Sequence, residues 1–375
     1  MSRKNPSRNE ADKEWHSEPI QTFFDPDGSR IKEYWRMLRI RKRLFFSVWA
    51  MAVWFTSIPT EGYAQTSQPR PTFINERSDV NQDSRVDAID LTILLQDLMK
   101  TTGPEVITID IPNLPTDARP MRLVRIPAGS FLMGNNGTSR DSGFCHCENC
   151  DCEFPRHEVT IGYDFFMSET EVTQAQWEAL MESNPSTLGT AHSVGNDYPV
   201  YYIAQNAIQS PDGFMARLNG LGQGEFRLPT EAEWEYACRG PESNPNRYSL
   251  FSFGDDEDFN MESCNLNSLL DEYMIWCGNH QGRLEFAGSR KPNGFGLYDM
   301  HGSVWEWCED EWHDNYNGAP SDGTAWTSGP SSLHVLRGGT WLGRPWLCKS
   351  SFRFGFPPES RDDDIGFRVV LQVPE

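Results

Sequence analysis

The sequence predicts an α+β domain, compact and rich in loops, over residues 121–375. Tryptophan, glycine, proline and asparagine become dense from Met121 onwards, which is typical of ordered loops. Helical periodicity is confined to short segments, and the apolar stretches between them have the length of short strands. No internal repeat has the spacing of a solenoid or a propeller. We therefore expect one domain in which short helices and short strands are joined by loops.

The first 64 residues predict a secretory signal peptide with a long polar n-region. Basic residues precede an apolar run, Leu44–Ile58, and Gly62-Tyr63-Ala64 is a small-x-small cleavage pattern. The run is too short for a transmembrane helix, so we expect no integral membrane span after cleavage. Met37 offers an alternative start to Met1. The mature protein is expected to be secreted or periplasmic, that is, extracytoplasmic.

The composition restricts the class of partner. The formal net charge is −21 at pH 7. So acidic a chain argues against nucleic acid or an anionic membrane surface as a binding partner. An acidic surface suits an exported protein, and such a surface could also bind cations.

Residues 65–77 predict a linker, and residues 78–101 then predict a calcium loop followed by a helix. Oxygen side chains fall at loop positions 1, 3, 5, 9 and 12, and the carbonyl at position 7 completes EF-hand spacing. The six positions are Asp79, Asn81, Asp83, Arg85, Asp87 and Asp90. The segment resembles half of a dockerin module, although Ser84 replaces the usual glycine. A plain acidic turn is the alternative, and a single repeat makes docking to a cohesin-like partner the less favoured role.

Capping signals predict two helices of the domain. Thr173 with Gln176 three residues later marks the start of one helix. Thr230 and Glu233 form a capping box for a helix over residues 231–238, and Gly240 ends it.

Other segments predict the remaining elements. Residues 102–120 contain several prolines and predict a second linker. A third helix is expected from about Gln205 to Leu221. Arg337-Gly338-Gly339 predicts a turn whose arginine pairs with a buried carboxylate, and Gly366–Val370 predicts a closing apolar strand.

Sequence blocks along residues 121–373 occur in a recognisable order. They are Ile126–Gly134, Glu158–Thr160, Glu169–Thr173, Arg227–Ala237, Asn293–Met300, Gly302–Trp307 and the closing run Arg337–Val370. Together these blocks resemble the formylglycine-generating enzyme, or sulfatase-modifying factor, family. The resemblance implies a formylglycine-generating-enzyme-like domain related to the C-type lectin fold.

The resemblance also implies calcium. Asp299 and Glu306 flank Gly302 in a bend where carbonyls can turn inward, and calcium takes six to eight oxygen ligands. The family site maps onto Asp299, Gly302, Val304 and Glu306, the middle two through their carbonyls. A second family site falls near Asn265, where the sequence that follows departs from the pattern.

Copper is implied only for a catalytically active member. Active enzymes carry two cysteines, five residues apart, which hold copper(I). Here Gly343 stands in the first position and Cys348 in the second. Copper(I) favours soft sulfur ligands, so one thiol is not equivalent to two, and Cys308 or Cys277 would have to supply the other sulfur. The alternative is that Cys348 is a buried small apolar residue or a disulfide partner.

The nine cysteines all lie beyond residue 144. Disulfides can form once the protein is exported, and the odd number of cysteines leaves at least one unpaired or metal-bound. In Cys145–Cys152 two C-x-C pairs bracket a C-x-x-C, a density that could hold zinc or copper. Disulfide stapling of a surface loop is the favoured interpretation, and a metal site stays open.

These patterns together favour a non-catalytic or divergent family member that binds a peptide, protein or glycan outside the cytoplasm. The alternative is an active oxidase, with Cys348 as its copper ligand, that converts a sulfatase cysteine to formylglycine with copper and oxygen.

Overall fold

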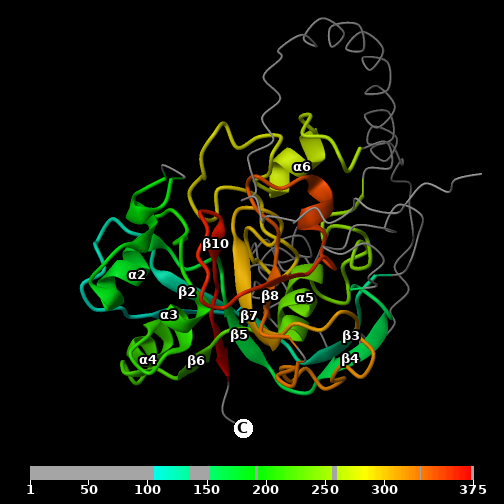
Figure 1. Cartoon of the computed structure of the whole chain (residues 1–375), viewed down its shortest axis with the longest axis horizontal. Coiled ribbons are helices and arrows are strands. Elements are labelled where there is room, and N and C mark those ends of the chain that lie inside the picture. The colour runs from blue at the N-terminus through cyan, green and yellow to red at the C-terminus, as the bar shows by residue number, and fades with distance from the viewer. Residues whose placement is uncertain (1–104, 136–151, 191–192, 256–259, 330, 373–375) are drawn as a thin grey trace, which may run out of the picture. The chain divides into compact units, whose positions relative to one another are not determined.

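The structure is a computed structural model that describes residues 105–135, 152–190, 193–255, 260–329 and 331–372 (Figure 1). Within these ranges no helix has the length and apolar character that a membrane crossing requires. The predicted signal peptide, the calcium loop at residues 79–90 and the cysteine run up to residue 151 lie outside the described residues. They stay predictions.

The largest sheet has five strands in the order β1-β2-β5-β11-β6, all antiparallel. The strands are β1 (Val106–Ile109), β2 (Met121–Ile126), β5 (Phe165–Ser168), β6 (Glu225–Arg227) and β11 (Val370–Gln372). Strand β2 lies next to the edge, and its two arginines point to solvent while its apolar residues are buried. Strand β5 is buried along its whole length, as expected for the central strand of a covered sheet.

Strand β1 corrects the predicted linker over residues 102–120. Val106 pairs with Val124 and Ile109 with Met121, so the domain begins earlier than the sequence indicated. A four-residue edge strand gives little local signal, because its pairing with β2 rather than its own periodicity holds it in place.

A second sheet has four strands in the order β10-β7-β8-β9, and a third has two. The four-stranded sheet contains β7 (Trp305–Glu311), β8 (His334–Arg337), β9 (Phe354–Phe356) and β10 (Ile365–Gly366), and the hairpin contains β3 (Gly129–Met133) and β4 (His157–Ile161). The closing strand predicted at Gly366–Val370 is therefore two strands in different sheets. Arg368 lies between them, fully buried and paired with Glu306, and a buried ion pair at that point interrupts the apolar run.

Both capped helices are confirmed. Helix α2 (Gln174–Met181) has Thr173 as its N-cap with a complete capping box. Helix α5 (Glu231–Arg239) has the same arrangement with Thr230 and Glu233, and Gly240 follows its last residue. Helix α6 (Ser268–Tyr273) and the 3-10 helices η4 (Pro185–Leu188) and η5 (Pro345–Cys348) complete the short elements near the site.

The third predicted helix, Gln205 to Leu221, is wrong as a single element. It is two helices, α3 (Gln205–Gln209) and α4 (Phe214–Asn219). Pro211 cannot donate an N–H, and a side chain at Gly213 would lie 2.8 Å from the carbonyl oxygens of Ala207 and Ile208. The chain therefore turns between the two helices, which pack against each other.

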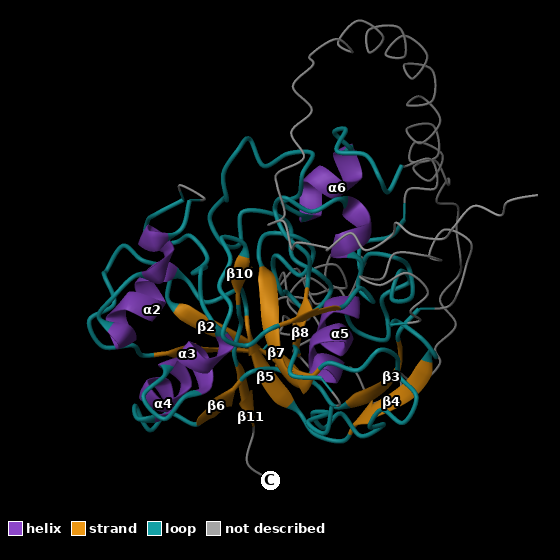
Figure 2. Ribbon diagram, viewed as in Figure 1, coloured by secondary structure: helices purple, strands orange, loops and turns teal. Residues whose placement is uncertain are grey.

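Figure 2 shows that loops make up much of the domain, as the sequence predicted. Helices α2 and α4 pack together on the side of β6, whereas α5 packs on β7 and β8 (Figure 1). The loop-rich α+β fold is therefore confirmed. It brings the turn after β8, helix η5 and the segment after α6 together, and these segments carry the candidate site.

Candidate functional site

The turn after β8 places the first part of the site. Arg337 is fully buried and donates hydrogen bonds to a Glu235 carboxylate oxygen and to the carbonyl oxygens of Ser350, Ser351 and Phe352. The predicted pairing of this arginine with a buried carboxylate is thus confirmed. Gly338 and Gly339 follow with φ of 94° and 82°.

Close packing requires glycine at the second of these positions. A Cβ added to Gly339 would lie 2.6 Å from the Cys348 Sγ atom and 2.8 Å from the Leu347 carbonyl oxygen. The positive φ and the missing side chain together let η5 pack on the turn. The Gly-Gly pair therefore fixes where Cys348 lies.

Cys348 is a buried thiol. It has no solvent exposure, and its thiol can donate to two carbonyl oxygens of the described residues, that of Thr340 at 3.9 Å and that of Arg344 at 3.8 Å. Burial raises the pKa of this thiol to about 12. Since the thiolate is the nucleophile of cysteine, this thiol is unreactive at neutral pH when no metal ion displaces its proton.

Gly343 lies in the position where a second sulfur would be needed. Its N–H donates to the Thr340 carbonyl oxygen at 2.8 Å, and its own carbonyl accepts from the Cys277 N–H at 3.0 Å. A Cβ added at Gly343 would lie 3.0 Å from the same Thr340 oxygen that the Cys348 thiol faces. The two positions therefore converge on one carbonyl, but only one of them carries sulfur.

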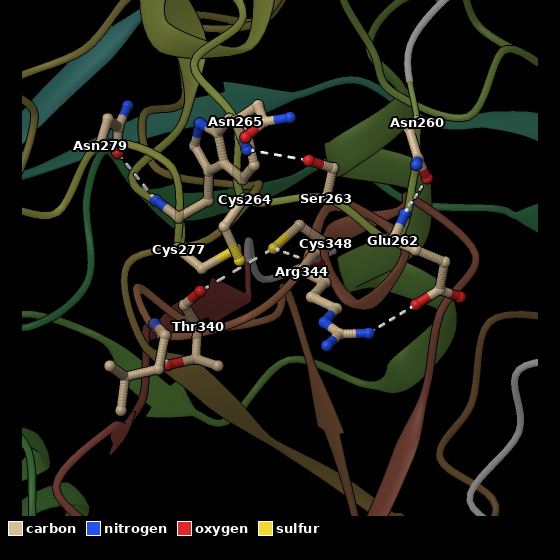
Figure 3. The surroundings of a disulfide bond; sticks show 12 residues. Asn260, Glu262, Ser263, Cys264, Asn265, Cys277, Asn279, Thr340, Arg344 and Cys348 are labelled. Atoms are coloured by element: carbon tan, nitrogen blue, oxygen red, sulfur yellow. Dashed lines mark hydrogen bonds and ion pairs between the residues drawn. A yellow bond between two sulfur atoms is a disulfide. The ribbon is translucent and has the colours of Figure 1, made fainter. Parts of the chain in front are cut away.

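Neither predicted substitute supplies the missing thiol. Cys277 forms a disulfide with Cys264, and Figure 3 shows this disulfide in the surroundings of Cys348. Cys308 lies on β7 in a different core cluster, where burial and then the charges of Asp310 and Glu231 raise the pKa of its thiol. Among the described residues, the donor set therefore does not fit copper(I), which requires two facing thiolates.

The disulfide was not assigned from the sequence. Cys264 and Cys277 are 13 residues apart and both lie in the segment that surrounds α6. Spacing alone does not determine pairing among nine cysteines, so this contact became visible only in the fold. Cys152, the last residue of the predicted cysteine-rich run, is also disulfide-bonded.

An apolar surface covers the thiol and continues to solvent. Phe251, Leu270, Met274 and Trp276 form one cluster with Cys348. Leu266 and Leu342 are 64% and 43% exposed, from the two segments that the Cys277–Gly343 hydrogen bond joins. Arg344 and Glu262 pair across the same two segments at 2.8 Å (Figure 3).

A second candidate site is a group of buried carboxylates. Asp299 and Glu306, both predicted calcium ligands, are buried, and Glu306 is bound by Arg368 at 2.6 Å and 2.7 Å. Glu306 also accepts from the Trp234 indole N–H at 2.7 Å. The structure adds Glu171, which the sequence did not single out.

Glu171 and Asp299 have oxygens that lack partners. Both carboxylate oxygens of Glu171 and Oδ1 of Asp299 are buried without a hydrogen-bond partner, while the other Asp299 oxygen accepts from the Gly288 N–H at 2.5 Å. Burial, followed by the charges of Asp299 and Glu306, raises the pKa of Glu171 well above its usual range. Burial also raises the pKa of Asp299. Buried unpaired oxygens of this kind suit a hard cation.

The backbone around Gly302 is compatible with that interpretation. Gly302 has φ of 87°, and an added Cβ would lie 2.0 Å from the Ile275 carbonyl oxygen, so only glycine fits. Val304 follows as a fully buried residue. The predicted carbonyl ligands thus lie in a tight bend directly before β7. The described residues contain no group of three or more His, Cys, Asp or Glu side chains arranged to hold a metal ion.

Asn265, the predicted residue of a second calcium site, is exposed. It follows Cys264 directly, and its N–H donates to the Ser263 hydroxyl at 3.1 Å. The structure does not bring it to Asp299 or Glu171. The predicted loop ligands at residues 79–90 lie outside the described residues.

Comparisons with known proteins agree with the fold. Residues 111–373 match the family model described as a sulfatase-modifying factor enzyme 1-like domain. Among solved structures, PvdO from Pseudomonas aeruginosa is 28% identical with a TM-score of 0.59, over 72% of this chain and 99% of that one. Treponema denticola variable protein 1 is 25% identical with a TM-score of 0.55, over 72% of this chain and all of that one.

The relatives include one protein named as a chaperone and others named as enzymes. A chaperone protein LppX of Paenibacillus barcinonensis is 27% identical over 56% of this chain and 81% of that protein. The formylglycine-generating enzyme of Mus musculus is also 27% identical, over 69% of this chain and 78% of the enzyme. Identity of this size is shared by relatives that are named as a chaperone and as an enzyme, so the site must decide between them.

Proposed function

The chain belongs to the sulfatase-modifying factor family, and from this premise we propose that it is a non-catalytic member that binds a peptide segment of another protein outside the cytoplasm. One observation carries this proposal: Gly343 has no side chain where a second thiol would be needed, so the buried thiol of Cys348 is alone there. A family scaffold that lacks its thiol pair keeps its surface but loses its redox chemistry.

The surface above Cys348 supports binding to a peptide segment. Leu266 and Leu342 expose aliphatic side chains, and the Arg344–Glu262 ion pair joins the two segments that carry them. An apolar centre with a charged rim is typical of a protein-binding surface. Sugars are more often held by exposed aromatic rings, which is why a peptide is preferred to a glycan here.

A disulfide beside the site supports a location in an oxidising compartment. The Cys264–Cys277 disulfide closes the segment around α6, which forms one side of this surface, and such bonds persist in exported proteins. The net charge of −21 suits a protein that meets its partners in solution outside the cell membrane. Both features support a secreted or periplasmic location.

Calcium is the cation that we propose for the carboxylate group. Asp299 and Glu171 would supply side-chain oxygens, and Gly302 and Val304 would supply carbonyls. Glu306, whose oxygens are held by Arg368 and Trp234, would add negative charge beside them. Calcium accepts this mixture of carboxylate and carbonyl oxygens. It would balance buried negative charge at the start of β7, and so it would have a structural role.

The proposal is tested with the purified full-length protein on an array of short synthetic peptides, beside a glycan array. Wild-type protein is expected to bind a subset of peptides, and Leu342→Asp is expected to lose those peptides because it places a charge in the apolar centre. Leu132→Asp is the matched control, since Leu132 is also exposed, at 37%, but lies on β3 outside this surface.

A parallel assay covers the enzyme alternative. The same protein, incubated with copper(I), oxygen and a C-x-P-x-R peptide, is expected to yield no formylglycine by mass spectrometry. Product formation, binding to glycans alone, or unchanged peptide binding by Leu342→Asp would each overturn the proposal.

A further inference from the structure

A small pocket lies apart from Cys348 and the carboxylate group, between the end of β3 and the end of α5. Gly134 and Asn135 line one side, Arg239 and the segment Tyr248–Leu250 another, and Arg156 and Ser351 close it. It opens to solvent, and its cavity volume is about 20 Å³. This is room for a small ion or a single chemical group rather than for a whole cofactor.

Three guanidinium groups surround Tyr248, whose ring forms one wall of the pocket. The guanidinium carbons of Arg156, Arg247 and Arg239 lie 4.6, 5.8 and 5.9 Å from the centre of that ring. Cation–π contacts of this kind hold the arginines in place. Positive charge is thus concentrated at one point of a strongly acidic chain.

The three arginines differ in how many hydrogen bonds they donate. Arg239 donates a hydrogen bond from each of its three nitrogens, to Glu235 and to the carbonyl oxygens of Arg247 and Gly134. Arg247 donates to the Ser130 carbonyl oxygen, but its Nε atom is buried without a partner. The Nε atom of Arg156 is likewise buried without a partner.

The carboxylates nearby are already neutralised. Glu235 binds both Arg239 and Arg337, and Glu153 accepts from Lys349 at 3.2 and 3.3 Å. Arg156 and Arg247 form no ion pair with any residue in the described ranges. Burial, followed by the charge of Arg239, lowers the pKa of Arg156, as expected for a cation that lacks a counter-charge. Arg247 is buried and Arg156 is partly buried, and a cation that lacks a counter-charge in such a place favours a bound anion.

We propose that this pocket binds a sulfate or phosphate group, free or as an ester on a larger molecule. Arg156 would contact the oxyanion directly, with Arg239 and Arg247 supplying positive field from behind. The guanidinium fork matches the geometry of a tetrahedral oxyanion and gives short charge-assisted hydrogen bonds. The Ser249 and Ser351 hydroxyls and the Asn135 amide are the neutral polar groups of the wall.

The test measures binding of sodium sulfate, sodium phosphate, a sulfated monosaccharide and phosphoserine to the full chain by calorimetry, at an ionic strength held constant with chloride. Saturable binding of at least one oxyanion is expected. Arg156→Ala should weaken it by about tenfold or more, the usual effect of losing a charge-assisted hydrogen bond. Arg156→Lys should weaken it less, because it keeps the charge and loses the fork.

Arg125→Ala is the control, because Arg125 is an exposed arginine that is ion-paired with Glu105 at 3.2 Å outside the pocket. It should bind like wild type. Arg156→Ala removes no hydrogen bond of the folded protein but does remove the cation–π contact with Tyr248, so its Tm in chloride should fall slightly. It should lack the extra rise in Tm that sulfate gives wild type.

Tighter binding of an ester than of its free ion identifies a group on a larger molecule as the ligand, and the reverse identifies the free ion. Both results retain the oxyanion site. Equal affinity of wild type and Arg156→Ala for every probe, or no saturable binding by wild type, overturns it.

Discussion

At the scale of residues, the loss of copper chemistry that we propose depends on two positions, Gly343 and Cys348. Gly343 and Cys348 both face the Thr340 carbonyl oxygen, through an added Cβ at 3.0 Å and a thiol at 3.9 Å. A cysteine at position 343 would place a second thiol near the same carbonyl oxygen. One sulfur alone stays protonated, because burial makes its anion costly.

This geometry predicts that Gly343→Cys creates a copper(I) site that wild type lacks. The residue does not have a positive φ, and its tightest side-chain neighbours, Thr340 Cγ2 at 3.1 Å and Leu347 Cδ1 at 3.4 Å, need to shift only slightly. Copper(I) affinity, measured by competition with a chelator under reducing conditions, should rise by several orders of magnitude.

Gly343→Ser is the matched control, because it has nearly the same size but no sulfur. It should leave copper(I) affinity at the wild-type level. Equal affinities of the cysteine and serine variants would show that the two positions do not converge as described.

At the scale of elements, α5 connects several parts of the domain, since it packs on β3, β7 and β8. The Thr230 hydroxyl accepts from the Glu233 N–H at 3.0 Å and donates to the Gly323 carbonyl oxygen at 2.9 Å. The Glu233 carboxylate binds Arg227 at 2.7 Å and accepts from the Tyr163 hydroxyl at 2.9 Å. The cap is therefore also a tertiary contact.

We predict that Thr230→Ala lowers the free energy of unfolding by about 2 kcal/mol, the upper end for loss of an N-cap, because a buried carbonyl also loses its donor. Urea unfolding followed by tryptophan fluorescence measures it. Thr173→Ala is the comparison, since Thr173 caps α2 through a longer contact of 3.4 Å and should cost about 0.5–1 kcal/mol. Equal losses in the two variants would contradict the tertiary role of the Thr230 cap.

Element boundaries were predictable where the signal is local. The capping boxes of α2 and α5 lie within four residues of sequence, and both helices were found. The break at Pro211 is also local, but helical spacing on either side of it hid the turn. Strand β1 and the division of the closing strand depend on partners more than a dozen residues away, and periodicity cannot show them.

The candidate sites were predictable to a smaller extent, because they combine distant residues. Asp299 and Glu306 could be proposed from the sequence since they lie in one block. Glu171 could not, because it comes from a segment more than a hundred residues earlier and only its partnerless oxygens identify it. The pairing of Cys264 with Cys277 and the arginines around Tyr248 likewise became visible only in three dimensions.

For the whole molecule, the most unusual feature is the amount of charge in its interior. Arg337, Arg353 and Arg368 are fully buried, each against a glutamate. Glu171 and Asp299 add two further buried carboxyl groups, and three of their four oxygens lack a hydrogen-bond partner. Calcium would complete the neutralisation of the interior.

We therefore predict that calcium stabilises the domain, with Tm higher in calcium than in a chelator. A concentration of about 100 times Kd adds about 2.7 kcal/mol to the free energy of unfolding. Glu171→Gln should remove most of this gain. It should not weaken the chelated protein, because it replaces a buried partnerless carboxylate with a neutral amide.

Asp83→Ala serves as the control for the predicted loop at residues 79–90. It should leave the calcium-dependent rise in Tm of the domain intact. A full rise in Glu171→Gln would rule out the carboxylate group as the site.

The position of β11 has a consequence for how the chain reaches its native state. This strand lies between β5 and β6, which precede it by about two hundred and by about 145 residues. A chain that emerges N-terminus first must hold both neighbours with open edges until residues 370–372 arrive, and open edges invite aggregation. Maturation of this domain is therefore a late, nearly all-or-none event, and the interval before it is the period in which the chain depends most on protection by other proteins.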